Sequence, residues 1–209
     1  MMQNVTYKLF EFFTLFILIP VSYVLDYPIV IKMFIGFVGF LYVIFVLLKV
    51  ESKQFKIANR LNWKLFSKKT IIKLTVIIVL TTTYVWLFDR TNLFLVVRNN
   101  PLKWLVILFI YSFFSVYPQE LIFRTLYFQR YESIFKSKSL MIFINAIVFS
   151  LAHLFFKNTL VLVLTFLGGL LFALTFQKTK STLLVSIEHA VYGCWLFTVG
   201  MGNMLGFPT

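Results

Sequence analysis

Long apolar runs separated by short polar stretches fill almost the whole chain. A membrane-spanning helix needs about 20 mostly apolar residues, and each run is close to that length. The alternating pattern typical of membrane β-barrel strands is not seen. We therefore predict seven helical spans, and an eighth if the tail from Gly200 or the stretch 120–135 re-enters the bilayer. The spans cover about 10–25, 28–48, 71–88, 102–118, 139–156, 159–176 and 183–199.

The composition supports a membrane protein. Hydrophobic residues make up 60% of the 209 residues, charged residues make up 13%, and the mean hydropathy is +0.90. A soluble domain is about half apolar and about a quarter charged. We predict an all-α, polytopic transmembrane helical bundle forming one membrane-embedded domain over 1–209. The single cysteine, Cys194, excludes an intrachain disulfide and is interpreted as a small buried hydrophobe.

The net charge of +13 is unevenly placed. With the N-terminus inside, fifteen of the 20 Lys and Arg residues fall on the inner side, at Lys8, in the predicted loops 49–73 and 124–138, and in the turn 178–180. This bias predicts a cytoplasmic N-terminus and contact with anionic lipid, and it argues against nucleic acid as a partner. The polar stretch 49–70 interleaves apolar side chains with lysines, which suits either an amphipathic helix on the inner leaflet or a plain solvated loop.

Three apolar runs carry ionisable residues, which are expensive at membrane depth and are therefore functional candidates. His153 and His189, the 2 histidines of the chain, lie in separate spans. Glu120 and Arg124 are four residues apart and can pair on one helix face, while Pro118 suits a helix start. These groups suggest one polar site inside the bundle. The plainer alternatives are a helix-end ion pair and interhelical hydrogen bonds.

The neighbours of the histidines refine this prediction. Phe149 precedes His153 by four residues, so its ring can pack beside the imidazole. Glu188 points about 100° away from His189 and would extend to the membrane surface, orient a neighbour or, as a residue at the end of its span, do neither. His153 lies about 20 Å from the start of its span, and His189 roughly 9–10 Å from the start of its own. A common site would need the fifth span to begin later or the segment 125–138 to enter the bilayer.

Three fragments together carry a family resemblance. They are Gln119-Glu120-x-x-x-Arg124, Phe149-x-x-x-His153 and His189-x-x-x-Gly193. In order and spacing they resemble the CAAX protease and bacteriocin-processing family, also called type II CAAX prenyl endopeptidase-like or abortive-infection-type proteins. That family's pattern is Glu-Glu-x-x-x-Arg, Phe-x-x-x-His and His-x-x-x-Asn or a similar polar residue. The resemblance covers roughly residues 100–200 and implies an intramembrane endopeptidase that cleaves near the cytoplasmic side.

The resemblance also implies roles for these residues. Gln119 takes the place of the first glutamate, which is the expected general base of the family, and Glu120 takes the place of the second. His153 and His189 would position the water, hold a metal or stabilise developing charge, and Arg124 would hold Glu120 ionised or brace the helix. Two positions depart from the pattern: Gln119 has no basic carboxylate to accept a proton, and Gly193 has no polar side chain for the oxyanion.

Three interpretations of the site stay open. Glu120 can be the base, with Gln119 as a positioning group. Alternatively His153, His189 and Glu120 hold a divalent metal such as zinc, which activates the water. In the third, the site is inactive and the protein binds the peptide that its relatives cut, as an immunity or scaffold protein. A small transporter is disfavoured, because the chain has no internal repeat.

The expected partners are the lipid bilayer and a membrane protein or peptide substrate. The chain is rich in Phe, Ile, Lys and Asn with few Arg, a composition typical of an AT-rich bacterial genome. We therefore expect an integral protein of a bacterial cytoplasmic membrane.

Overall fold

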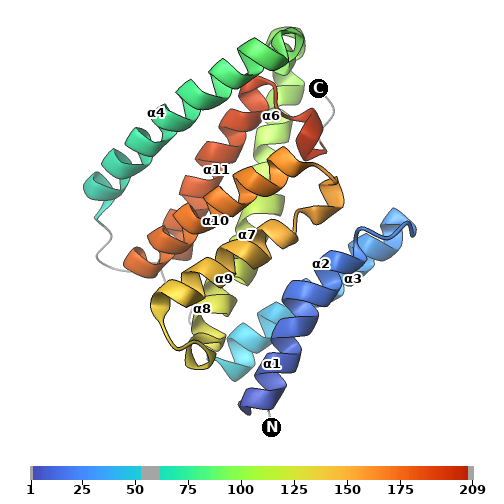
Figure 1. Ribbon diagram of the computed structural model, residues 1–209, viewed down its shortest axis with the longest axis vertical. Helices are drawn as coiled ribbons and strands as arrows, with labels where there is room; N and C mark the ends of the chain where they lie inside the picture. Colours follow the sequence, from blue (N-terminus) through green and yellow to red (C-terminus); the bar gives the residue numbers. More distant parts are fainter. Residues whose placement is uncertain (1, 53–61, 207–209) are drawn as a thin grey trace. The chain divides into compact units, whose positions relative to one another are not determined.

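The computed structural model describes residues 2–52 and 62–206, and this part is helical without strands (Figure 1). It contains 7 helices long and apolar enough to cross a membrane, which confirms the predicted all-α polytopic bundle. These helices are Val5–Ser22, Ile29–Val50, Trp63–Phe88, Pro101–Arg130, Lys138–Phe156, Thr159–Thr179 and Thr182–Val199.

The fourth spanning helix differs most from prediction, because it continues to Arg130. The predicted helix start at Pro118 is wrong, and residues 120–130 prolong this helix instead of re-entering separately. Its parts are α6 (Pro101–Ile110), η4 (Tyr111–Val116), α7 (Tyr117–Glu120), η5 (Leu121–Leu126) and α8 (Tyr127–Arg130), of which η4 and η5 are π-helical. Proline lacks an N–H and its ring crowds the preceding turn, so a widened turn lets the helix pass Pro118.

The third spanning helix, α4 (Trp63–Phe88), also begins earlier than predicted. Within the polar stretch 49–70, residues 53–61 lie outside the described part of the chain, and Trp63 to Thr70 form the first turns of α4. Lys73 lies inside α4, and Arg124 and Arg130 lie inside the fourth helix. These three cations were assigned to loops, so that assignment is wrong; the orientation of the N-terminus stays a prediction.

The chain forms two compact units. The first contains 2–52 and 119–182 of the described residues, and the second contains 62–118 and 183–206. In the first unit, α9 (Lys138–Leu151) and α10 (Thr159–Thr179) run side by side (Figure 1). A Cβ on Gly169 would lie 3.0 Å from the Ala146 Cα, so small residues allow this close helix contact.

The second unit is built from α4, α5 (Leu95–Asn99), α6 and α11 (Thr182–Val199), of which residues from Leu183 belong to it. Indole N–H groups hold α11 to both neighbours. Trp195 Nε1 donates to Thr81 Oγ1 of α4 at 2.9 Å. Trp104 Nε1 of α6 donates to Thr198 Oγ1 at 3.0 Å. Each bond satisfies a polar group that would be costly to leave unmade in a membrane.

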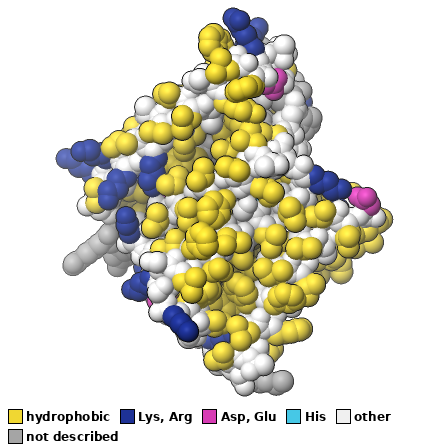
Figure 2. Space-filling model, viewed as in Figure 1, with side chains coloured by type: hydrophobic (Ala, Val, Ile, Leu, Met, Phe, Trp, Pro, Cys, Tyr) yellow, Lys and Arg dark blue, Asp and Glu magenta, His cyan; other side chains and the backbone are white. Residues whose placement is uncertain are grey.

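Apolar side chains cover the outer surface of the spanning helices. The face in Figure 2 is largely hydrophobic, and its Lys and Arg side chains lie toward the margins. Phe34, Leu80 and Phe114 are 65%, 64% and 72% exposed. A soluble protein rarely exposes apolar patches of this kind, whereas a bilayer covers them. The protein is an integral, multi-pass membrane protein.

Candidate active site

Glu120 and Arg124 form a fully buried ion pair in the first unit. Glu120 ends α7, Arg124 lies one turn later in η5, and both side chains are 0% exposed. The Arg124 Nε lies 3.4 Å from Glu120 Oε2, which confirms the predicted pairing. Each charged side chain stabilises the other, because an unpaired ion is strongly destabilising in a low-dielectric interior.

Phe149 connects this ion pair to His153. The guanidinium carbon of Arg124 lies 4.7 Å from the centre of the Phe149 ring, within the range of a cation–π attraction. The Phe149 and His153 rings are 4.9 Å apart between centroids, as the spacing predicted. Residues of the first two motifs therefore form one continuous set of contacts: Glu120, Arg124, Phe149 and His153.

His153 follows the end of α9, and its ring is fixed by a backbone contact. Its Nδ1 lies 2.8 Å from the Phe149 carbonyl oxygen. Because a carbonyl can only accept, Nδ1 carries the proton, and in the neutral imidazole Nε2 carries the lone pair. A common depth for His153 and His189 would have needed the fifth span to begin later than predicted. The helix begins at Lys138, so this explanation is wrong.

Two neighbours of this site were not identified from the sequence. The fully buried Asn145 donates from Nδ2 to the Phe123 carbonyl at 2.7 Å, and Arg124 NH1 donates to the same oxygen at 3.2 Å. The Phe172 ring of α10 lies 5.8 Å from the Arg124 guanidinium. An asparagine inside an apolar span was an available signal for Asn145, because such amides hydrogen-bond between helices.

In the second unit, Glu188 is fully buried and pairs with Lys73. Its Oε1 accepts hydrogen bonds from Lys73 Nζ at 2.6 Å and from the Tyr192 hydroxyl at 2.9 Å. Of the interpretations of Glu188, the one in which it contacts neighbouring side chains agrees with these bonds. Lys73 was missed because it was counted as a loop cation. The i, i+4 spacing of Glu188 and Tyr192 could have indicated their contact.

His189 lies in the same helix and is 6% exposed. The Tyr111 ring approaches it edge-on, with centroids 6.0 Å apart at 83°. Gly193, one turn beyond, leaves room for this tyrosine, because a Cβ there would collide with the Tyr111 hydroxyl. Cys194 is half-buried, with its Sγ 3.5 Å from the Ser112 hydroxyl.

The predicted site residues are divided between the units. Gln119, Glu120, Arg124 and His153 belong to the first, and His189 belongs to the second. A shared site that includes His189 stays a prediction.

A metal held by His153, His189 and Glu120 stays a prediction. Within 2–52 and 62–206, no three His, Cys, Asp or Glu side chains are grouped to hold a metal ion. The Arg124 charge beside Glu120 also opposes a second cation at that carboxylate.

The first unit also contains a second buried charge network. Arg130 donates from Nε to Glu11 Oε2 at 2.6 Å and from NH1 to Glu51 Oε1 at 2.8 Å. Arg130 is 0% exposed. Burial raises the pKa of the adjacent Tyr131 phenol above its ordinary value, and the nearby Glu11 charge adds to the shift. This network connects a residue within Val5–Ser22, one directly after Ile29–Val50 and one at the end of α8.

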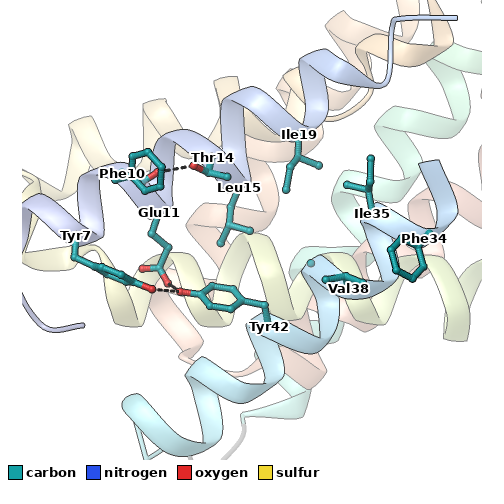
Figure 3. Close-up of a pocket in the computed structure, with 11 residues that line it drawn as sticks. Tyr7, Phe10, Glu11, Thr14, Leu15, Ile19, Phe34, Ile35, Val38 and Tyr42 are labelled. Carbon is teal, nitrogen blue, oxygen red and sulfur yellow. Dashed lines mark hydrogen bonds between the residues drawn. The ribbon is translucent and has the colours of Figure 1, made fainter. Parts of the chain in front are cut away.

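A cavity of about 420 Å³ lies beside that network, between Val5–Ser22 and Ile29–Val50 (Figure 3). Leu15, Ile35 and Val38 line its apolar part. At its polar end the Tyr42 hydroxyl donates to Glu11 Oε1 at 2.6 Å, and the Tyr7 hydroxyl lies 3.0 Å from that of Tyr42. None of the site residues expected from the sequence lines this cavity.

The fold and the buried polar side chains define a polytopic helical membrane protein with a candidate hydrolytic site. Residues 101–195 match the family model of the type II CAAX prenyl endopeptidases, Rce1-like. This segment contains all three motifs, and the match confirms the family that they resemble. Over this segment, which is slightly less than half of the chain, the protein is similar to CAAX-type intramembrane proteases. Comparisons with curated proteins and with solved structures gave no match.

Proposed function

We propose that this protein is an intramembrane endopeptidase that hydrolyses a peptide bond of a membrane-associated protein or peptide. The observation that carries the proposal is the set of contacts from Glu120 through Arg124 and Phe149 to His153. It lies inside the segment that matches the protease family. Family resemblance alone would leave open whether these residues meet, so their contact is the stronger support.

In this mechanism Glu120 is the general base. A water oxygen attacks the peptide carbonyl carbon, Glu120 takes the proton, and the carbonyl electron pair moves to its oxygen. The C–N bond then breaks, and the leaving amine takes the proton from Glu120. His153 orients the water through Nε2, His189 stabilises developing charge, and Gln119 helps position the substrate. General acid–base catalysis of this kind contributes about 10²–10⁴-fold.

Arg124 compensates the charge of Glu120 and holds its carboxylate in place. The same positive charge makes Glu120 a poor metal ligand, so we assign water activation to the carboxylate. The alternative source of activation is a divalent metal such as zinc on His153, His189 and Glu120. A chelator distinguishes the two.

A second candidate function is non-catalytic binding of a membrane peptide, as an immunity or scaffold protein. Two observations favour it. Gln119 occupies the position of the first glutamate, and the Glu120 carboxylate is fully buried against Arg124. A base with so little access to solvent would need rearrangement before it could accept a proton from water.

The test is cleavage of a membrane-peptide library by the purified protein in detergent. Wild type is compared with Glu120→Gln, His153→Ala and His189→Ala, each with and without a chelator. The exposed Lys136→Ala is the matched control. We expect cleavage by wild type and the control, loss in the three site variants, and no effect of the chelator. Full activity in folded His153→Ala would refute its assignment, and an inactive but folded wild type would favour the binding function.

A further inference from the structure

The cavity between Val5–Ser22 and Ile29–Val50 lies within the first unit and extends along both helices. On the first helix its lining runs from Tyr7 to Ile19, a rise of about 18 Å. Phe10 and Phe34 also line it and are 69% and 65% exposed, so the cavity opens toward the bilayer around these spanning helices. Its volume of about 420 Å³ falls within the range of ligand sites, roughly 300–1,000 Å³. These dimensions suit one extended apolar chain that enters from the membrane.

Gly39 keeps the middle of the cavity open. It lines the cavity from α3 (Ile29–Phe45), and a Cβ built on it would meet no described atom within 4 Å. Neighbouring apolar side chains border this space without filling it, among them Leu15 and Val38. A ligand chain can therefore pass directly over the backbone of Gly39.

The polar end of the cavity offers hydrogen-bond acceptors (Figure 3). The Tyr42 hydroxyl donates to Glu11 Oε1 at 2.6 Å, so its oxygen accepts the proton of the Tyr7 hydroxyl, 3.0 Å away. The Thr14 hydroxyl donates to the Phe10 carbonyl at 2.9 Å. The three lining hydroxyls thus use their single protons within the protein, while their oxygens and the carboxylate keep lone pairs. An occupant with a hydrogen-bond donor fits this end, whereas a carboxylate or a phosphate does not.

The charge at this end favours a cationic donor. Glu11 and Glu51 share the single guanidinium of Arg130, so these three side chains carry one net negative charge. Glu11 lines the cavity and is only 5% exposed, and charges interact more strongly where water is scarce. A primary ammonium combines a compact positive charge with three N–H donors, so it satisfies both requirements.

We propose that this cavity binds a lipid with one apolar chain and a primary ammonium head. The chain lies between the two helices, against Leu15, Ile35 and Val38. The ammonium donates to the Glu11 carboxylate and to the Tyr7 oxygen. None of the site residues expected from the sequence lines the cavity, so this binding does not depend on the proposed peptidase function.

The probe is dodecylamine with a diazirine on its chain, added to the purified full-length protein in a maltoside detergent at neutral pH. After irradiation, mass spectrometry of the peptides locates the label, which we expect within 7–19 and 34–42. Unlabelled dodecylamine should compete at least about tenfold better than dodecanol, because a hydrogen bond between charged groups is worth more than that factor. Dodecanoate should compete least.

Two variants test the cavity and its charge. Gly39→Phe fills the open space and should abolish labelling at 7–19 and 34–42 while the protein stays folded by size-exclusion chromatography. Val30→Phe, on an exposed residue of the same helix outside the cavity, is the matched control and should label as wild type does. Glu11→Gln removes the negative charge and should make dodecylamine and dodecanol compete equally.

Each contrary result overturns a stated part of the inference. Label spread over the apolar surface, or unchanged in folded Gly39→Phe, would show that only bulk lipid covers the cavity. Equal competition by dodecanol and dodecylamine in wild type would overturn the ammonium head, and stronger competition by dodecanoate would overturn the excess of acceptors. If Glu11→Gln does not fold, the competition series on wild type and the labelling of Gly39→Phe decide without it.

Discussion

The guanidinium of Arg124 lies against the ring of Phe149, with 4.7 Å between the guanidinium carbon and the ring centre. The Phe149 ring also contacts His153, and the centroids of the two rings are 4.9 Å apart. The same aromatic ring thus contacts both the buried cation and the imidazole. It attracts the cation through its π electrons and packs beside a histidine that we propose to act on water.

Replacing Phe149 with leucine should weaken this arrangement. The substitution retains a buried apolar side chain but removes the cation–π contact with Arg124. We expect the free energy of unfolding to fall by about 2 kcal/mol, the size of a desolvated cation–π contact, with reduced cleavage. Denaturant unfolding in detergent and a cleavage assay measure the two effects. Phe172→Leu, whose ring is farther from the guanidinium at 5.8 Å, should cost less; equal losses would contradict the role of Phe149.

Arg130 should be essential for the stability of the first unit. Arg130→Met would leave Glu11 and Glu51 without their shared cation, and a broken buried ion pair typically costs about 3–5 kcal/mol. Size-exclusion chromatography in detergent measures this effect as a loss of folded protein. Combining Arg130→Met with Glu11→Gln and Glu51→Gln should restore much of the folded fraction. If Arg130→Met alone is as stable as wild type, the network is not structural.

Lys73 should stabilise the second unit through Glu188. Removing the cation with Lys73→Met leaves the buried carboxylate with the Tyr192 hydroxyl as a donor, at 2.9 Å. We expect a loss of about 2 kcal/mol, the size of a hydrogen bond to a charged group. A double-mutant cycle with Glu188→Gln measures the coupling in denaturant unfolding. Additive effects of the two substitutions would show that the observed 2.6 Å contact contributes nothing to stability.

The predicted orientation can be tested with single cysteines. In a Cys194→Ala background, Lys136→Cys lies between α8 and α9, and Lys157→Cys lies between α9 and α10. With a cytoplasmic N-terminus, a membrane-impermeant thiol reagent should label residue 157 on intact cells and residue 136 only after lysis. The reverse pattern would place the N-terminus outside.

The apolar runs were sufficient to predict the seven spans, but not where the polar ends of helices lie. The fourth helix extends to Arg130, whose buried acidic partners Glu11 and Glu51 are far away in the sequence and are supplied only by the folded structure. The start of α4 was missed for a related reason. Its first turns carry lysines that lower the local hydropathy without preventing a helix.

Contacts within one helix or one motif were predictable, whereas contacts between helices were not. The Glu120–Arg124 pair and the Phe149–His153 contact follow from i, i+4 spacing. The contact of Arg124 with Phe149 depends on how α9 packs against η5, which no local pattern encodes. The same holds for Tyr111 over Gly193, because the two residues are brought together only by tertiary packing.

The overlap between the Tyr111 hydroxyl and a side chain at 193 also has an evolutionary consequence. Two positions that share one volume cannot change independently, so their sizes should covary among related sequences. A large residue at 111 should accompany glycine at 193, and a polar side chain at 193 should accompany a smaller residue at 111. A substitution at either of the two positions should therefore be accepted only together with a compensating change at the other.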